Sequence, residues 1–218
     1  CVHHGSFIAA VQRFDNVAFL ISKAEANAMS PEQRLLLELG YAALHGAMHR
    51  RSTLLGGDCG VCLGMEHSEW REAMPPEVQQ SFYAATGMDS SVSAARLSFT
   101  LGLTGFCASI DTACASALSA LHAASSFVLG GEAAHAVHLS VGLKLSATGT
   151  LGAANAGMLS IDGHSKTFDQ SANGYARGEG SDTAVLSRDS VAGCRCVLLH
   201  GCGVRQNGRS ATLTAPLA

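Results

Sequence analysis

The feature that most constrains the fold of this chain is the stretch IDTACASALSALH, residues 110–122, where two residue patterns meet at one cysteine. The residues before Cys114 are typical of a strand ending in a polar turn, and those after it are small or apolar on every side. A helix without a polar face is buried in a larger body. The stretch therefore predicts a strand that leads into a buried helix, with Cys114 as the first residue of that helix.

This position makes Cys114 a candidate nucleophile. The free N–H groups and partial positive charge at the amino end of a helix stabilise a nearby thiolate. The thiolate, and not the thiol, is the form of cysteine that attacks thioesters. The alternative is that Cys114 is a buried structural cysteine, which is a common fate of this residue type. The local pattern leaves both interpretations open.

Composition fits one compact domain and argues against several classes of function. The 218 residues are 47% hydrophobic and 14% charged, as in ordinary globular domains. A net charge of −3 gives no strong field for nucleic acid or an anionic membrane. We expect no apolar run long enough to span a bilayer, and the first residues lack the features of a secretory signal. We expect an intracellular protein, cytoplasmic or organellar, and leave open an upstream targeting peptide.

Eight cysteines and ten histidines raise the alternatives of a disulfide framework and a metal site. A chain of this length and core content folds without disulfides, so we expect reduced thiols. Cys59 and Cys62 form a C-x-x-C, but no second pair follows at zinc-ligand spacing. The surrounding DCGVCLGM reads instead as a short buried strand, and we expect no metal.

Alternating patterns indicate a layered α/β domain. Ser30, Pro31 and Gln33 form a capping box that begins a helix. Predicted helices cover residues 31–48, 76–85, 90–101 and 114–129. Predicted strands cover residues 60–65, the segment before Cys114, and residues 136–143, 182–186 and 196–203, whereas residues 149–180 are predicted to be mostly loop.

Four blocks of sequence carry a resemblance to a known family. In order, they are RFDNVAFLISKAEANAMSPEQRLLLELGYAAL, SSVSAARLSFTLGLTGFCASIDTACASALSALHAA, AGMLSIDGHSKTFDQSANGYARGEG and VRQNGRSATLTAP. Together they resemble β-ketoacyl synthases, the condensing enzymes of fatty-acid and polyketide synthesis, and are most like the modular type I polyketide class. The blocks span nearly all of residues 14–216.

The resemblance implies the thiolase-like fold, a layered α-β-α-β-α arrangement whose two similar halves each contribute a five-stranded sheet around a central buried helix. Residues 1–218 are expected to form mainly the N-terminal half of one such domain, without its first strand and its C-terminal histidine half. Because the first strand belongs in the middle of the first sheet, its neighbours are expected to have unpaired edges.

The resemblance also implies an acyltransferase activity. Cys114 would take an acyl group from a phosphopantetheine thioester, and a malonyl unit on an acyl carrier protein would then lose carbon dioxide and attack the acyl-enzyme. The backbone N–H of Cys114 would be one oxyanion donor, and two histidines and a lysine would come from the second half. No metal or redox cofactor is needed, since acyl groups arrive on a carrier protein or CoA. Residues 1–218 alone are expected to be inactive in condensation.

The expected partners follow from the same resemblance. They are an acyl carrier protein and either a second copy, in a homodimer formed through the strand at residues 105–110, or a polypeptide that supplies the second half. No nucleic acid and no membrane span are expected. The alternative from a different functional class is a non-catalytic, ketosynthase-derived structural or interaction subunit of a larger assembly.

Other polar residues resemble family positions with structural roles. Asp111 and Thr112 lead into the cysteine and are predicted to fix the turn by hydrogen bonds. Asp169, Arg177 and Glu179 are predicted to form an internal ion-pair network below the active site.

Overall fold

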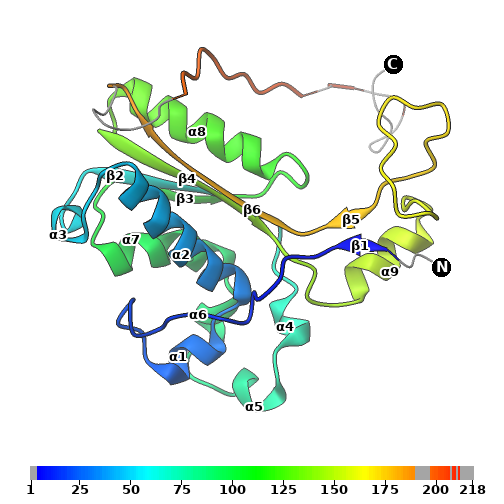
Figure 1. The fold of residues 1–218 in the computed structure, drawn as a ribbon, viewed down its shortest axis with the longest axis horizontal. Coiled ribbons are helices and arrows are strands. Elements are labelled where there is room, and N and C mark those ends of the chain that lie inside the picture. Colours follow the sequence, from blue (N-terminus) through cyan, green and yellow to red (C-terminus); the bar gives the residue numbers. More distant parts are fainter. Residues whose placement is uncertain (1–3, 190–196, 207, 210, 212–218) are drawn as a thin grey trace.

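The computed structural model describes residues 4–189, 197–206, 208, 209 and 211. Within these residues the centre of the molecule is a four-stranded sheet in the order β3-β2-β4-β6, with helices on both faces (Figure 1). Three strands run parallel and β6 runs antiparallel to β4. Their bounds are Cys59–Gly64 (β2), Cys107–Ile110 (β3), His135–Gly142 (β4) and Gly180–Ser187 (β6). The layered α/β prediction is confirmed.

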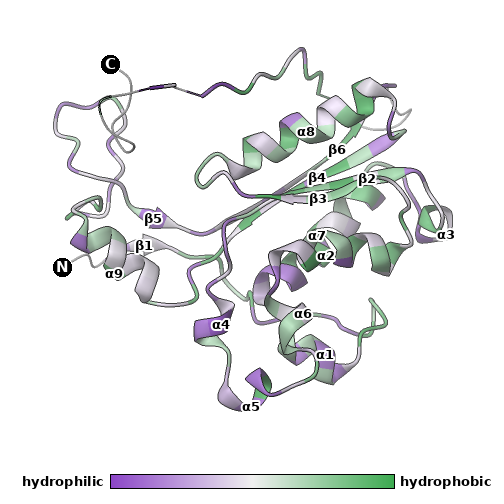
Figure 2. Ribbon diagram, turned by 180° about the vertical axis from the view of Figure 1, so that it is seen from behind, coloured by the Kyte–Doolittle hydropathy of each residue, from purple (hydrophilic) through white to green (hydrophobic). Residues whose placement is uncertain are grey.

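The two faces of the sheet have cores of different size. The larger core lies under α2 (Pro31–Gly46) and α7 (Ser90–Leu101), where leucines of both helices meet Val61 and Leu63 of β2. The smaller core lies under α8 (Ser116–Gly130) on the opposite face, and Figure 2 shows the same layers from behind. Successive strand residues point to opposite faces, so one strand serves both cores.

Only one side of α8 is buried by the described residues. Ala120, Ala124 and Val128 pack against the sheet, while Leu118 and Leu129 are 68% and 70% exposed on the outer side. The predicted burial of the helix in a larger body is confirmed for its inner side, and within the described residues no second layer covers its outer side.

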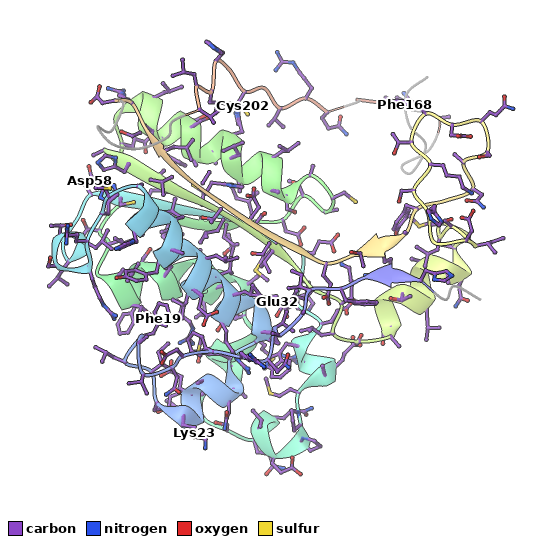
Figure 3. The ribbon with its side chains drawn as sticks, in the orientation of Figure 1. Phe19, Lys23, Glu32, Asp58, Phe168 and Cys202 are labelled. Atoms are coloured by element: carbon purple, nitrogen blue, oxygen red, sulfur yellow. The ribbon has the colours of Figure 1, made fainter. Side chains whose placement is uncertain are left out.

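The start of α2 follows the predicted capping. Ser30 Oγ accepts a hydrogen bond from the Gln33 N–H at 3.2 Å, and Pro31 occupies the first helical position. The Gln33 side chain then donates to the Thr86 carbonyl at 2.9 Å, which ties α2 to the distant short helix α6 (Ala84–Met88). Glu32 lies in the same buried first turn (Figure 3). The helix ends at Gly46, two residues before its predicted end.

The middle of the sheet has no gap. β2 and β4 pair directly over six residues, from Cys59 with His135 to Gly64 with Ser140. The expectation that strands beside an absent central strand would have unpaired edges is therefore wrong here, because the two flanking strands satisfy each other's backbone groups.

Several predicted bounds also need correction. The helix predicted at residues 76–85 is two short helices, and a helix begins at Thr148, where mostly loop was predicted. Residues 197–203 form no strand, and residue 196 lies outside the described residues. The remaining elements are β1 (Gly5–Ser6), α1 (Lys23–Ala28), α3 (Arg51–Leu54), α4 (Trp70–Ala73), α5 (Pro76–Gln79), α6 (Ala84–Met88), α9 (Thr148–Asn155) and β5 (Arg177–Gly178).

One described segment, Ala113–Gly130, is long and apolar enough to cross a membrane by length and composition. The expectation that no run of this length occurs is therefore corrected. The segment includes α8, whose inner side packs on β2 and β4, and core helices meet the same criteria of length and composition.

Candidate active site

Cys114 lies in the turn between β3 and α8, at the carboxyl edge of the parallel strands. β3 ends at Ile110, and α8 begins at Ser116 with Ala115 as its N-cap. Cys114 thus precedes the helix by two residues, and the prediction that it is the first helical residue is wrong by that amount. Its side chain is exposed in the described structure, which contradicts the alternative of a buried structural cysteine.

Local hydrogen bonds hold the turn. The Asp111 carboxylate accepts from the Ala113 N–H at 2.9 Å. Ser116 Oγ accepts from the Thr112 N–H at 2.9 Å and donates to the Ala113 carbonyl at 2.7 Å. Thr112 Oγ1 also lies 2.9 Å from Ser119 Oγ. These bonds confirm the predicted structural role of Asp111 and Thr112.

The backbone immediately before the cysteine has an uncommon conformation. Ala113 has a φ of 52°, in the left-handed region that residues other than glycine rarely adopt. Such a conformation persists only where the surrounding structure over-determines it. The hydrogen bonds of the turn supply that constraint, so the position of Cys114 is fixed from both sides.

Two residues of the sheet lie beneath the first turn of α8. At Gly64, a β-carbon would lie 2.5 Å from the Ser116 carbonyl carbon and 2.7 Å from the Ala117 nitrogen. His138 on β4 is 2% exposed, and its Nε2 lies 2.9 Å from the Ala117 carbonyl oxygen. The carbonyl can only accept, which assigns the proton to Nε2.

Burial lowers the pKa of His138, against the raising effects of the Ala117 carbonyl and Asp182. The ring is therefore neutral at pH 7. Its second nitrogen, Nδ1, is buried without a hydrogen bond and lies 4.0 Å from an Asp182 carboxylate oxygen. No local sequence pattern marks the contact of His138 with Ala117, because the two residues lie 21 positions apart in the chain.

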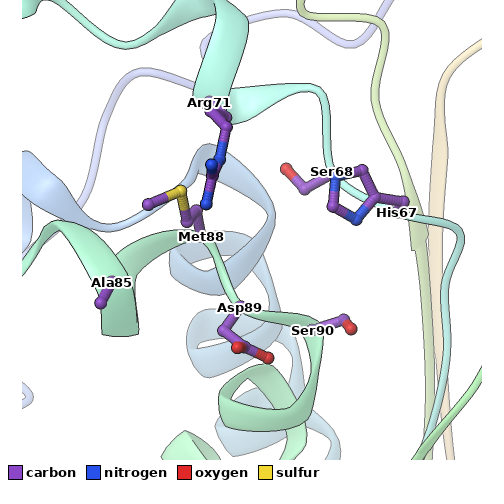
Figure 4. A pocket seen from close by; sticks show the side chains of 7 residues that line it. All are labelled: His67, Ser68, Arg71, Ala85, Met88, Asp89 and Ser90. Atoms are coloured by element: carbon purple, nitrogen blue, oxygen red, sulfur yellow. The ribbon is translucent and has the colours of Figure 1, made fainter. Parts of the chain in front are cut away.

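A pocket of about 370 Å³ lies beside the loop that follows β2 (Figure 4). It belongs to the same sheet edge as Cys114, since the Ser109 hydroxyl of β3 donates to the Ser90 carbonyl at its rim at 2.6 Å. This edge is where open α/β sheets commonly bind ligands, and the volume is within the range of small-molecule sites. Its lining residues are His67, Ser68, Arg71, Ala85, Met88, Asp89 and Ser90.

Of the three residues predicted to form an internal ion-pair network, Arg177 alone makes an ion pair within the described residues, and its partner, Glu69, was not indicated by the sequence. Arg177 Nη2 lies 3.7 Å from Glu69 Oε1. The other carboxylate oxygen of Glu69 accepts from the backbone N–H groups of Leu145 and Ser146, both at 2.9 Å. Glu69 thus connects the loop after β2 with the segment after β4.

The two other predicted members have different roles. Glu179 accepts backbone N–H bonds from Ile8 and Lys144, each at 2.8 Å, and so binds three segments together. Asp169 makes only local bonds, to the N–H and hydroxyl of Ser171 at 2.7 Å. The predicted ion-pair network of Asp169, Arg177 and Glu179 is therefore wrong within the described residues: Glu179 binds backbone N–H groups, and the Asp169 carboxylate is used in its own turn.

Cys59 and Cys62 lie on β2 and are buried. Burial raises the pKa of Cys59 to about 11 and that of Cys62 to about 12. Residues three apart in a strand point to opposite faces, so this pair cannot chelate one ion. Within the described part of the chain, no three His, Cys, Asp or Glu side chains are placed to hold a metal ion.

Comparison with known proteins identifies the family. Residues 1–192 match the family model "Beta-ketoacyl synthase, N-terminal domain". Because this match covers most of the chain, the chain belongs to the β-ketoacyl synthase family.

The curated relatives are large multidomain synthases. The chain is 37% identical over 213 residues to the highly reducing polyketide synthase dmxL2 of Cryptosporiopsis, and covers 9% of that protein. It is 36% identical over 211 residues to the highly reducing polyketide synthase aurA of Calcarisporium arbuscula, covering 8% of it. Polyketide synthase PksL of Bacillus subtilis is 35% identical over 216 residues, of which the chain covers 5%. These alignments include 95%, 94% and 95% of the present chain.

Solved structures show the same fold. A mutant form of the ketosynthase from module 6 of the Bacillus subtilis bacillaene synthase superposes with a TM-score of 0.80 and 32% identity, over 95% of this chain and 35% of that one. The oxazolomycin ketosynthase domain OzmH KS7 of Streptomyces albus gives 0.77 and 29%, over 84% and 32%. The described residues therefore have the thiolase-like fold of ketosynthases and correspond to about the N-terminal half of it.

Proposed function

We propose that this chain is the nucleophile-bearing part of a polyketide ketosynthase, in which Cys114 accepts the growing acyl group. The observation that carries the proposal is the exposed Cys114 thiol, held in a constrained turn between β3 and α8 in a chain of this family. Among the other described cysteines, Cys59 and Cys62 are buried in β2 and are unsuited to meet a substrate.

The reaction would have two steps. The Cys114 thiolate attacks the carbonyl carbon of an acyl thioester; an S–C bond forms and the phosphopantetheine thiolate leaves. A malonyl thioester on an acyl carrier protein then loses carbon dioxide, and its carbanion attacks the acyl-enzyme carbon, releasing Cys114. The Cys114 N–H would be one donor to the oxyanion of each tetrahedral intermediate. No resident metal or redox cofactor takes part, and acyl groups are delivered on phosphopantetheine.

The pocket near His67 and Met88 would receive part of the acyl chain. It lies at the same edge of the sheet as the Cys114 turn. Its walls combine apolar side chains, Ala85 and Met88, with the polar groups of Arg71 and Asp89. A pocket of this mixed character suits a chain that carries oxygen functions.

Two uncovered surfaces support the proposed partners. Leu118 and Leu129 on the outer side of α8 are exposed, which fits a second half that covers α8 and brings two histidines and a lysine to Cys114. β3 is an edge strand of the described sheet, which fits pairing with a second copy in a homodimer.

The test uses the complete polypeptide with Cys114→Ser and, as a matched control, Cys107→Ser. Cys107 is also exposed and lies on β3. We expect a radiolabelled acyl thioester to label the Cys114 peptide in wild type and in the control, and Cys114→Ser to lose both labelling and condensation. Labelling on another cysteine would overturn the assignment. A complete protein that takes up no acyl group would favour the structural-subunit alternative.

A further inference from the structure

We propose that His138 is a positioning residue for Cys114, which sets the first turn of α8 through its hydrogen bond to the Ala117 carbonyl. The proposal rests on the proposed role of Cys114 as the nucleophile. His138 touches neither the thiol nor any reacting atom, so its effect passes through the backbone of the turn.

The geometry places the ring between the sheet and the helix. His138 is paired with Cys62 of β2 and Ala184 of β6, and its ring lies on the side of the sheet that α8 covers. At 2% exposure, with Nε2 at 2.9 Å from the Ala117 oxygen, the hydrogen bond is shielded from water. A bond in such a low-dielectric site is stronger than one at the surface.

The inner side of α8 is formed by small or branched apolar residues, Ala120, Ala124 and Val128. These side chains hold the helix on the sheet and fix its position along its own axis less sharply than large interlocking side chains would. A hydrogen bond is directional. His138 supplies one at the first turn, three residues after Cys114, and within the described residues no other side chain of the sheet bonds that turn.

The other end of α8 is held by a different residue. Arg188, which follows β6, donates through Nε to the Val128 carbonyl at 2.8 Å and through Nη2 to the Leu129 carbonyl. Carbonyl groups at both ends of α8 therefore accept hydrogen bonds from side chains of the sheet region: His138 donates at the first turn and Arg188 at the last. Arg188 provides a matched control, because its loss frees the end of α8 that is remote from Cys114.

The groups that face His138 define what its replacement changes. From β6, Asp182 lies 4.0 Å from Nδ1; from β2, Cys62 is its strand partner; from α8, the contact is the Ala117 carbonyl. A leucine at 138 would keep much of the volume and remove the donor, leaving the Asp182 carboxylate without its neighbouring ring. A glutamine at 138 would place its amide N–H close to the position of the histidine Nε2, where it could still donate to the Ala117 carbonyl.

The experiment measures the pH–rate profile of Cys114 alkylation by iodoacetamide in the complete polypeptide, with peptide mapping, together with the rate of acylation by an acyl thioester. We expect His138→Leu to move the midpoint of the profile and to slow acylation about 10-fold or more, as for a nucleophile displaced by a fraction of an ångström. His138→Gln should restore both to near the wild-type values. Arg188→Met should lower thermal stability and leave the profile unchanged.

The outcomes separate this proposal from the proposed function. If wild-type Cys114 is not acylated, the nucleophile assignment fails first. If wild-type Cys114 is acylated and His138→Leu matches it in profile and rate, only the positioning role is overturned. Should His138→Leu not fold, His138→Met is the second donor-less variant of similar volume. Failure of both to fold, with His138→Gln folded, would show a role in stability alone and overturn the positioning role.

Discussion

Gly64 at the end of β2 lies directly beneath Ser116, so close that a β-carbon on the glycine would stand 2.5 Å from the serine carbonyl carbon. Backbone contacts of this kind cannot relax by a side-chain rotation. The end of one strand therefore sets how near the first turn of α8, and with it Cys114, approaches the sheet.

The first prediction concerns this contact. Gly64→Ala should lower the free energy of unfolding by about 3 kcal/mol, at the upper end of overpacking effects, and should slow alkylation of Cys114, because the turn must move away from the sheet. Gly142→Ala is the matched control, since Gly142 ends β4 and a β-carbon added there would meet nothing within 4 Å. Chemical denaturation and labelling of the complete polypeptide measure both effects. Equal stability of the two variants would contradict the contact.

The second prediction is the order in which cysteines react. Iodoacetamide at about pH 7.5 should modify Cys114 well ahead of Cys59 and Cys62, because Cys114 is exposed while burial raises the pKa of the other two to about 11 and about 12. Peptide mapping after short exposure measures the order. Early labelling of Cys59 or Cys62, with Cys114 intact, would count against the site.

The third prediction is a pH dependence at Glu32. This carboxyl is 2% exposed, and burial raises its pKa despite hydrogen bonds from Ser30 and Ser68. The folded state therefore binds its proton more tightly than the unfolded state, so the contribution of Glu32 to stability is fully present below the unfolded pKa and is lost as the pH rises through the folded pKa.

Glu32→Gln should consequently be more stable than wild type at about pH 8 and should lose that advantage below about pH 4, where the carboxyl is protonated in both states. Thermal unfolding across this pH range measures the difference. Glu38→Gln, on the same helix and only partly buried, controls for removal of one negative charge. A constant difference across the pH range would show that burial does not hold the Glu32 proton.

The fourth prediction concerns the outer edge of β3. Phe106 and Ile110 direct their carbonyls to β2, so the alternate residue Cys107 directs its backbone groups outward. We expect the complete protein to be a dimer through this edge and Cys107→Pro, which removes an outward N–H, to weaken it. Cys107→Ser keeps the N–H and should remain dimeric. Light scattering measures the masses, and a strictly monomeric wild type would exclude the interface.

The sequence determined those features that depend on neighbours within about four residues. The Ser30 cap and the start of α2, the end of α7 at the left-handed Gly102, and the hydrogen bonds of Asp111 and Thr112 before Cys114 follow from local chemistry. Local backbone requirements restrict the residue types at these positions. The position of Cys114 relative to the start of α8 could therefore be predicted to within two residues.

Only the tertiary structure decided the contacts between segments far apart in the chain. His138 bonds Ala117 across 21 residues, Glu69 rather than Asp169 pairs with Arg177, and β2 pairs directly with β4. The contact of His138 and the pairing of β2 with β4 depend on strand register, and a shift of one residue would turn His138 to the opposite face of the sheet. No local pattern encodes register, so the supports beneath Cys114 became visible only when the strands were paired.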